Sequence, residues 1–466
     1  MRRRLPRTRR GVLTLLGSLL TVAVALAVGG YFYVQGRTGS VYPHPNARFV
    51  KEPAPSPKPK PTPVAKFVWP RYGYDLTHTR YFPAPESMRP PYRKVWEAKE
   101  TGLLEFPPTM SGERIFQLAD DGVLSAIATK TGRTIWSKKL GELSASTPAV
   151  LGGTVYVTIL SRGGGSANGR VVALQAKNGN VIWSHNLPSR SESSPTVANG
   201  KVMFGSEAGT VFALNATNGR TIWTYQAAGA VKASPTLYKG VLYFGDYAGE
   251  LQAVSERTGR RIWISGSEGA PLGSGTFYST AAVAYGRVYL GNTDGRIYAY
   301  EASSGRLDWA VQTGAYVYGS PAVTDAPGLG PTIYEGSYDG TLYAINARSG
   351  QIEWRHAASG PISGGATIIG KVVYFSNLRT YMTTGLNTTT GKLVFQIRQG
   401  AFDPGISDGT NLYLDGYNTL FCFAPASASS ASSGSSNSSV QSSRSGGTKA
   451  PAPASGTSGK AASKKN

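Results

Sequence analysis

"LNATNGRTIW", residues 214–223, is one of seven similar segments that decide the fold of this 466-residue chain. Five further copies end in Trp and one ends in Phe: "IATKTGRTIW" (127–136), "LQAKNGNVIW" (174–183), "VSERTGRRIW" (254–263), "YEASSGRLDW" (300–309), "INARSGQIEW" (345–354) and "LNTTTGKLVF" (386–395). Their final aromatic residues are 40–47 residues apart. A repeat of this length, built from short strands, is typical of β-propeller blades.

Each repeat is predicted to form a four-stranded antiparallel sheet. Residues 195–223 contain four apolar runs separated by the turn signals "NG", "AG" and "TNG". Before the third run, a pair that ends in Gly recurs as Asp121-Gly122, Asn168-Gly169, Asp294-Gly295, Asp339-Gly340 and Asp415-Gly416. Both residues of such a pair tolerate positive φ, so the pairs predict two-residue hairpins.

The two ends of the repeat region complete one further blade. Residues 409–426 supply inner strands with no following Trp, and residues 92–102 supply a strand with Trp96 but nothing before it. Joined, they close the ring and remove its exposed sheet edges. We therefore predict an all-β, eight-bladed β-propeller over residues 67–424.

The repeated motif has a packing role in this fold. A small residue in the third strand and a Gly in the following turn leave room for the aromatic residue of a neighbouring blade. The docking aromatics are Trp96, Trp136, Trp183, Trp223, Trp263, Trp309, Trp354 and Phe395. A row of ligand-binding tryptophans is the less favoured interpretation.

The pattern Ala-x-x-x-x-Thr/Asn/Ser-Gly-x-x-x-Trp resembles the tryptophan-docking motif of the pyrroloquinoline-quinone (PQQ)-like β-propeller superfamily. The stretch "WPRYGYDLTHTRYFPAP" (69–85) is similar to the segment before the first blade in that superfamily. The superfamily holds both quinoprotein dehydrogenases and non-catalytic scaffolds related to the outer-membrane assembly propeller. Fold resemblance alone does not separate them. The chain departs from the pattern where the superfamily favours Asp, at Ala128, Gln175, Asn215, Ser255, Glu301, Asn346 and Asn387.

The flanking segments indicate the compartment. Residues 1–10 form a basic head, and residues 11–34 are uncharged and long enough for a transmembrane signal-anchor helix. A cleaved signal peptide is the alternative. Residues 35–66 are a Pro/Lys-rich linker, and the Ser/Gly/Ala-rich tail, 425–466, is expected to be disordered. The propeller should lie on the extracytoplasmic side of the cell membrane. The single cysteine, Cys422, supplies neither a lipid-attachment site after the apolar run nor an intramolecular disulfide.

The net charge of +22 does not indicate a nucleic-acid partner. Most of it lies in the head, the linker and the tail, which would face a membrane or an anionic cell wall. The four histidines, His44, His78, His185 and His356, have no metal-ligand spacing and are expected at the surface or in turns. We expect no metal and no catalytic residue. PQQ is conceivable but not expected as a cofactor, because the chain cannot form an adjacent Cys-Cys pair.

One mouth of the channel is the candidate binding site. Alignment of the blades on the Pro of "SSPTV" and its equivalents places Glu192, Lys232, Tyr278 and Tyr318 in loops before consecutive innermost strands. The same alignment gives the remaining blades apolar residues: Leu104, Ala145, Ile362 and Ala401. A polar loop without a ligand is the simpler interpretation.

These observations favour a monomeric ring that acts as a non-catalytic protein-interaction or envelope-assembly scaffold. The first alternative is a PQQ-dependent quinoprotein oxidoreductase. The second is a module that binds cell-wall polysaccharide through the aromatic mouth.

Overall fold

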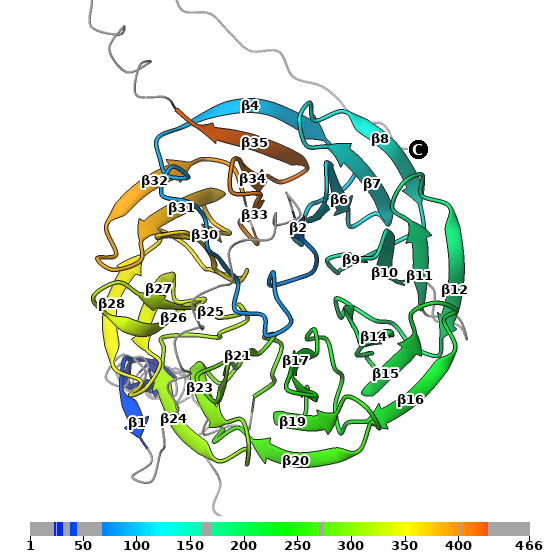
Figure 1. The fold of residues 1–466 in the computed structure, drawn as a ribbon. Helices are drawn as coiled ribbons and strands as arrows, with labels where there is room; N and C mark the ends of the chain where they lie inside the picture. Colours follow the sequence, from blue (N-terminus) through cyan, green and yellow to red (C-terminus); the bar gives the residue numbers. More distant parts are fainter. Residues whose placement is uncertain are drawn as a thin grey trace, which may run out of the picture. The chain divides into compact units, whose positions relative to one another are not determined.

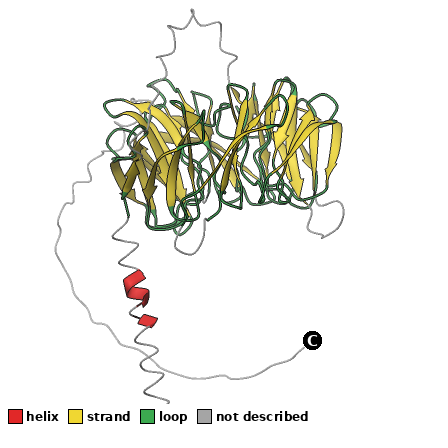
Figure 2. Cartoon of the chain, turned by 90° about the horizontal axis from the view of Figure 1, so that it is seen from below, coloured by secondary structure: helices red, strands yellow, loops and turns green. Residues whose placement is uncertain are grey.

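The computed structural model describes residues 23–24, 26–30, 38–43, 68–160, 169–269, 275–400 and 402–426. Eight antiparallel four-stranded blades surround one axis, as predicted (Figure 1). Viewed edge-on, the blades form one layer with connections on two opposite faces (Figure 2).

In blades 1 to 7 the four strands run from the axis to the circumference in chain order. Blades 1 and 2 contain β5 (Thr109–Ser111), β6 (Arg114–Leu118), β7 (Val123–Ala128), β8 (Thr134–Lys139); β9 (Ala149–Leu151), β10 (Thr154–Leu160), β11 (Gly169–Gln175), β12 (Val181–Leu187). Blades 3 and 4 contain β13 (Thr196–Ala198), β14 (Lys201–Phe204), β15 (Thr210–Asn215), β16 (Thr221–Gln226); β17 (Thr236–Tyr238), β18 (Val241–Gly245), β19 (Glu250–Ser255), β20 (Arg261–Gly266). Blades 5 and 6 contain β21 (Ala282–Ala284), β22 (Arg287–Gly291), β23 (Arg296–Glu301), β24 (Leu307–Gln312); β25 (Ala322–Ala326), β26 (Gly330–Gly336), β27 (Thr341–Asn346), β28 (Ile352–Ala357). Blade 7 contains β29 (Thr367–Ile369), β30 (Val372–Asn377), β31 (Met382–Asn387), β32 (Leu393–Ile397).

Blade 8 closes the ring with strands from both ends of the repeat region. Its inner strands are β33 (Ile406–Ser407), β34 (Leu412–Asp415) and β35 (Thr419–Pro425), and its outer strand is β4 (Tyr92–Lys99). Cys422 pairs with Trp96 in this blade, as the small residue pairs with the docking aromatic in the others. The predicted shared blade is confirmed.

The docking aromatics connect neighbouring blades. The indole N–H of Trp223 in blade 3 donates to the carbonyl of Glu256 in blade 4 at 3.0 Å. A side chain at Gly259 would place its Cβ 2.7 Å from the Trp223 ring, and Gly259 has a φ of +68°. All seven docking tryptophans make the equivalent bond to the next blade, and Phe395 has no N–H with which to do so. The docking tryptophans thus join neighbouring blades.

The predicted two-residue hairpins are wrong in position. Two-residue hairpins instead connect the first and second strands of a blade, where Asn199-Gly200 and Lys239-Gly240 have positive φ at both residues. At Asp121-Gly122 only the glycine has positive φ, because the Asp side chain accepts a hydrogen bond from the backbone N–H of Val123 and forms a longer turn. Asp294 and Asp339 accept equivalent bonds. Asp415 is the last residue of β34, and Asn168 lies outside the described residues.

The segment before blade 1 crosses the centre of the ring (Figure 1). It begins with β2 (Val68–Trp69), which pairs with β5 of blade 1, and reaches β3 (Tyr81–Phe82), which pairs with β29 of blade 7. Between them it forms at least one hydrogen bond with the innermost strand of each intervening blade. These bonds are Val150 N–H to Pro70 O, Arg71 Nη2 to Val197 O, Leu237 N–H to Leu76 O, Val283 N–H to Thr77 O and Val323 N–H to Thr79 O. We call residues 68–82 the axial segment.

The flanks are described only in part. Residues 26–30 are helical, and most of the predicted transmembrane helix lies outside the described residues. None of the helical residues that the structure describes belongs to a helix long and apolar enough to span a membrane. Within the predicted linker, β1 (Val41–Pro43) pairs with β24 at the outer edge of blade 5. The predicted tail, apart from residues 425–426, lies outside the described residues.

Candidate functional site

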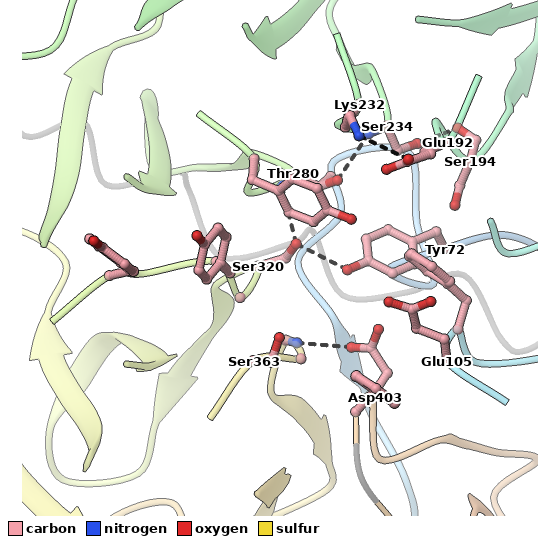
Figure 3. Close-up of a pocket in the computed structure, with 18 of the residues that line it drawn as sticks. Tyr72, Glu105, Glu192, Ser194, Lys232, Ser234, Thr280, Ser320, Ser363 and Asp403 are labelled. Atoms are coloured by element: carbon pink, nitrogen blue, oxygen red, sulfur yellow. Dashed lines mark hydrogen bonds and ion pairs between the residues drawn. The ribbon is translucent and has the colours of Figure 1, made fainter. Parts of the chain in front are cut away.

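A cavity of about 370 Å³ is lined by the axial segment and by the loops that lead into the innermost strands (Figure 3). We call it the axial cavity. Tyr72 of the axial segment contributes to its lining, and its hydroxyl hydrogen-bonds the Ser320 hydroxyl of blade 6 at 3.0 Å. Blades 1, 3, 4, 5, 6, 7 and 8 supply the other lining residues. Tyr247 and Tyr338, from turns between second and third strands, reach the same cavity.

The four residues predicted from the mouth alignment all line this one cavity. Glu192 precedes β13, Lys232 precedes β17, Tyr278 precedes β21 and Tyr318 precedes β25. The repeated blade geometry brings them together although they span more than a hundred residues. That the cavity binds a ligand stays a prediction.

The expectation of apolar residues in the other blades is wrong at two positions. Thr109 pairs with Phe116 as Thr196 pairs with Met203, so Glu105, rather than Leu104, is the equivalent of Glu192. Leu104 is buried in the core. The double proline in "EFPPT" allows two alignments, and the Thr that follows the second proline is the signal that selects the correct one.

The same one-residue shift occurs in blades 7 and 8. Ser363 and Phe402 line the cavity, whereas Ile362 is fully buried. Neither "SGGAT" nor "FDPGI" contains Pro at the position of Pro195, so the sequence alignment lacked its anchor. Ala401 lies outside the described residues. Ala145 is correctly aligned but is not among the residues that line the cavity.

Lys232 is held between two carboxylates. Its Nζ lies 2.8 Å from Glu192 Oε1 and 3.3 Å from Glu207 Oε1. The same ammonium group lies 5.5 Å from the centroid of the Tyr247 ring. Lys232 therefore has its charge neutralised within its own loop cluster and is not a free anion-binding group.

Tyrosine rings form a continuous cluster along one side of the cavity. Tyr318 is central, with ring centroids of Tyr338, Tyr278 and Tyr316 at 4.9, 5.8 and 5.9 Å. The interplanar angles are 66°, 85° and 75°, so the rings meet edge to face. Tyr247 extends the cluster through a 6.2 Å contact with Tyr278. The cavity thus presents rings in several orientations rather than one flat platform.

Asp403 is buried beside the cavity and is neutralised by an arginine of the axial segment. Arg80 Nη2 lies 2.6 Å from Asp403 Oδ1, and the same guanidinium donates to the carbonyls of Gly365 and Ala366. It also lies 4.7 Å from the centroid of the Tyr72 ring. This buried pair fixes the axial segment to blades 7 and 8 beneath the cavity.

Glu105 is the carboxylate in the lining without such a partner. Among the described residues, none donates a hydrogen bond or forms an ion pair with its side chain. Burial raises the pKa of Glu105 to about 7, and the charges of Glu192 and Asp403 contribute to the rise. The mouth alignment missed this residue.

His78 corrects a second expectation from the sequence. It is buried rather than at the surface, and its Nδ1 lies 3.0 Å from the Thr236 hydroxyl. Burial lowers the pKa of His78 to about 3, with contributions from Arg71 and Arg80. Among the described residues, no cluster of His, Cys, Asp or Glu could hold a metal ion.

The charges of the cavity do not fit PQQ. This quinone carries three carboxylates and needs cationic partners. Among the described lining residues, Lys232 is already paired with Glu192 and Glu207, Asp403 is paired with Arg80, and Glu105 adds a carboxylate without a cationic partner. A tricarboxylate would therefore meet net negative charge in a partly desolvated cavity.

Comparisons with known proteins agree with the fold. The chain matches the family described as outer membrane protein assembly factor BamB over residues 92–165, 120–265 and 247–412. No curated protein sequence matched the chain.

Solved structures with the same fold include BamB and alcohol dehydrogenases. BamB from Moraxella catarrhalis is 18% identical with a TM-score of 0.59, over 72% of this chain and 100% of that chain. Quinohemoprotein alcohol dehydrogenase from Comamonas testosteroni is 16% identical with a TM-score of 0.61, over 77% of this chain and 80% of that chain. A europium-containing methanol dehydrogenase is 13% identical with a TM-score of 0.62, over 78% of this chain and 98% of that chain. At these identities the likeness concerns the fold alone.

Proposed function

Because the chain belongs to the family of the outer membrane protein assembly factor BamB, we propose that it is a non-catalytic protein-interaction scaffold of the bacterial cell envelope. The face that carries the axial cavity is the interaction surface. The alternative activity, PQQ-dependent oxidation, requires a cofactor that the charges of the cavity disfavour.

One observation carries this proposal. Three tyrosines are at least half exposed in the described part of the chain, and all lie on the cavity face: Tyr316, Tyr381 and Tyr417. Tyr316 leads into β25, Tyr381 connects β30 and β31, and Tyr417 connects β34 and β35. Tyrosine supplies a large contact area with little loss of conformational freedom and is enriched at protein interfaces. Exposed tyrosines confined to one face favour a partner that docks there.

Photo-crosslinking in cells tests the proposal. A photoreactive amino acid at Tyr417, which is 60% exposed, should capture a discrete protein partner. Leu151 is the matched control, because it is 46% exposed and ends β9 at the turn to β10, on the opposite face. Equal capture at both positions, or none at Tyr417, would refute the proposed interface. PQQ- and Ca²⁺-dependent dye reduction on adding an alcohol would replace the scaffold by an oxidoreductase.

We also propose that residues 11–34 anchor the protein in the cell membrane with the propeller on the extracytoplasmic side. The support is the uncharged 24-residue run after a basic head. The protein should remain in membranes after a high-salt wash. A mature N-terminus near Gly36 would show cleavage and contradict the anchor.

A further inference from the structure

We infer that the axial cavity binds a primary ammonium group, presented by a lysine side chain of the protein partner. This inference rests on the proposed scaffold function and names the chemistry that the cavity recognises. It follows from the charges, the rings and the hydroxyl groups of the lining.

The charge of the cavity favours a cation. Lys232 and Arg190 together offset Glu192 and Glu207, and Arg80 offsets Asp403, so Glu105 remains as the carboxylate in surplus. Its raised pKa shows that ionisation of this group is costly in the empty cavity. A bound ammonium group would offset that cost, whereas an anion would increase it.

The tyrosine cluster suits the same guest. The negative faces of aromatic rings attract cations. Rings in several orientations can surround a compact ammonium group, whereas a sugar ring would stack better on one flat aromatic surface. The chain already makes two such contacts at this cavity, between Lys232 and Tyr247 and between Arg80 and Tyr72. In the described part of the chain, Tyr278 and the other rings around Tyr318 make no cation contact.

The shape and polarity of the cavity favour lysine over arginine. The lining includes Ser194, Ser234, Thr280 and Ser363. Their hydroxyl groups already hydrogen-bond within the protein, and each oxygen keeps a lone pair that can accept from an ammonium group. Arginine presents a planar fork that is best matched by a bidentate carboxylate. The tyrosine side of the cavity can pack along the aliphatic stem of a lysine as it enters from the exposed face.

The experiment uses the full-length protein in detergent and a blocked peptide, acetyl-Gly-Ser-Lys-Ser-Gly-amide. Peptides with acetyl-lysine, norleucine or arginine at the centre are the matched ligands, and glucosamine is the saccharide probe. Binding is measured by calorimetry up to about 10 mM, because a single charged contact supports only weak affinity. The pKa of Glu105 is followed by NMR with and without peptide.

The lysine peptide should bind, and acetyl-lysine or norleucine should weaken binding about tenfold or more. Glu105→Gln should cause a similar loss, and Tyr318→Leu a smaller one. Glu113→Gln, which removes an exposed carboxylate paired with Lys130, should change nothing. Peptide binding should also lower the pKa of Glu105. Near-ultraviolet circular dichroism identifies any variant that fails to fold.

Equal binding of the lysine and norleucine peptides would overturn the inference, as would tighter binding of the arginine peptide or of glucosamine. Absence of binding by the folded protein at 10 mM would overturn it as well. The scaffold proposal has a separate outcome. If Tyr417 captures a partner and Glu105→Gln leaves that capture unchanged, the scaffold stands and the lysine inference fails. If the lysine peptide binds but Tyr417 captures nothing, recognition of an ammonium group by the cavity stands, and its assignment to a protein partner fails together with the scaffold proposal.

Discussion

The contact between Trp223 and Gly259 gives a sharp test of how the blades are joined. Gly259 and Gly240 are both in the left-handed region, at φ of +68° and +77°. A Cβ at Gly259 would lie 2.7 Å from the Trp223 ring, whereas a Cβ at Gly240 would have no atom within 4 Å. Alanine at either position therefore introduces similar backbone strain, and only Gly259→Ala also disturbs the docked ring.

The difference between the two variants measures the docking contact. Backbone strain should cost about 1–2 kcal/mol in both, and overpacking should add about 1–3 kcal/mol in Gly259→Ala. For a ring of roughly 360 residues, an unfolding entropy of about 2.1 cal/mol/K per residue converts each kcal/mol into roughly 1.3 °C of Tm. We expect Gly240→Ala to lower the Tm by about 1–3 °C and Gly259→Ala by about 3–6 °C.

Scanning calorimetry of the two variants, of Trp223→Ala and of the double variant Trp223→Ala/Gly259→Ala checks the reasoning. Trp223→Ala should cost about 3–5 kcal/mol, and with the ring removed Gly259→Ala should cost no more than Gly240→Ala. The double variant should therefore be more stable than the sum of the single effects implies. Equal Tm losses for the two glycine variants, or strict additivity, would refute the docking account.

Other predictions concern buried charges. The pKa of His78 is lowered to about 3, so the unfolded chain binds a proton below about pH 6.5 that the folded chain does not bind. Between pH 7 and 5, the wild type should therefore lose about 2 kcal/mol of unfolding free energy relative to His78→Gln in denaturant titrations, and a constant difference between the two proteins would contradict this. The pKa of Glu105 is raised to about 7 in the folded state, so its ionisation destabilises the fold at pH values above about 4.5, the pKa in the unfolded chain. Glu105→Gln should therefore be more stable than the wild type by up to about 3 kcal/mol at pH 8, and the difference in unfolding free energy should shrink toward pH 4.5. A difference that does not change with pH would contradict this. Arg80→Met should cost about 3–5 kcal/mol because Asp403 is left unpaired, and adding Asp403→Asn should recover part of that loss in the same titration.

The fold could be predicted because one packing solution is written seven times in the sequence. The spacing of Trp136, Trp183 and their equivalents defines the blade, and even the shared eighth blade follows from the unmatched ends. Because the motif is repeated, a copy that departs from the pattern, such as the one that ends in Phe395, can still be assigned to a blade by its spacing from the other copies.

The site was predictable only where its blades keep the common pattern. Glu192 and Lys232 sit at a regular distance before a Pro, so alignment places them correctly. Glu105 and Ser363 precede irregular strand entries, where a shift of one residue exchanges a core side chain for a cavity side chain. Identifying Glu105 and Ser363 as cavity residues required the pairing register of the strands that follow them, which only the structure supplies.

The axial segment escaped prediction for a different reason. Most of its contacts with the blades use backbone carbonyls, such as those of Leu76 and Thr77, which leave no side-chain signature. His78 and Arg80 are buried within it, and a titratable residue in a short unrepeated stretch suggests solvent exposure when no partner is visible in the sequence.

The order of contacts along the axial segment bears on how the protein is made. Apart from the side-chain bonds of Tyr72 to blade 6 and of His78 to blade 4, the hydrogen bonds of the segment from β2 to β3 reach blades 1 to 7 in the order in which the ribosome synthesises these blades. Each newly completed blade could therefore pack against the next one or two residues of the axial segment, which has already been synthesised. The growing array of blades would then be stabilised at its centre before the ring is complete. The outer strand of blade 8, Tyr92–Lys99, is the exception, because its partner Thr419–Pro425 is synthesised last. Until then this strand is an unpaired edge, so the interval before the final residues emerge is the period in which the nascent protein most needs protection from aggregation.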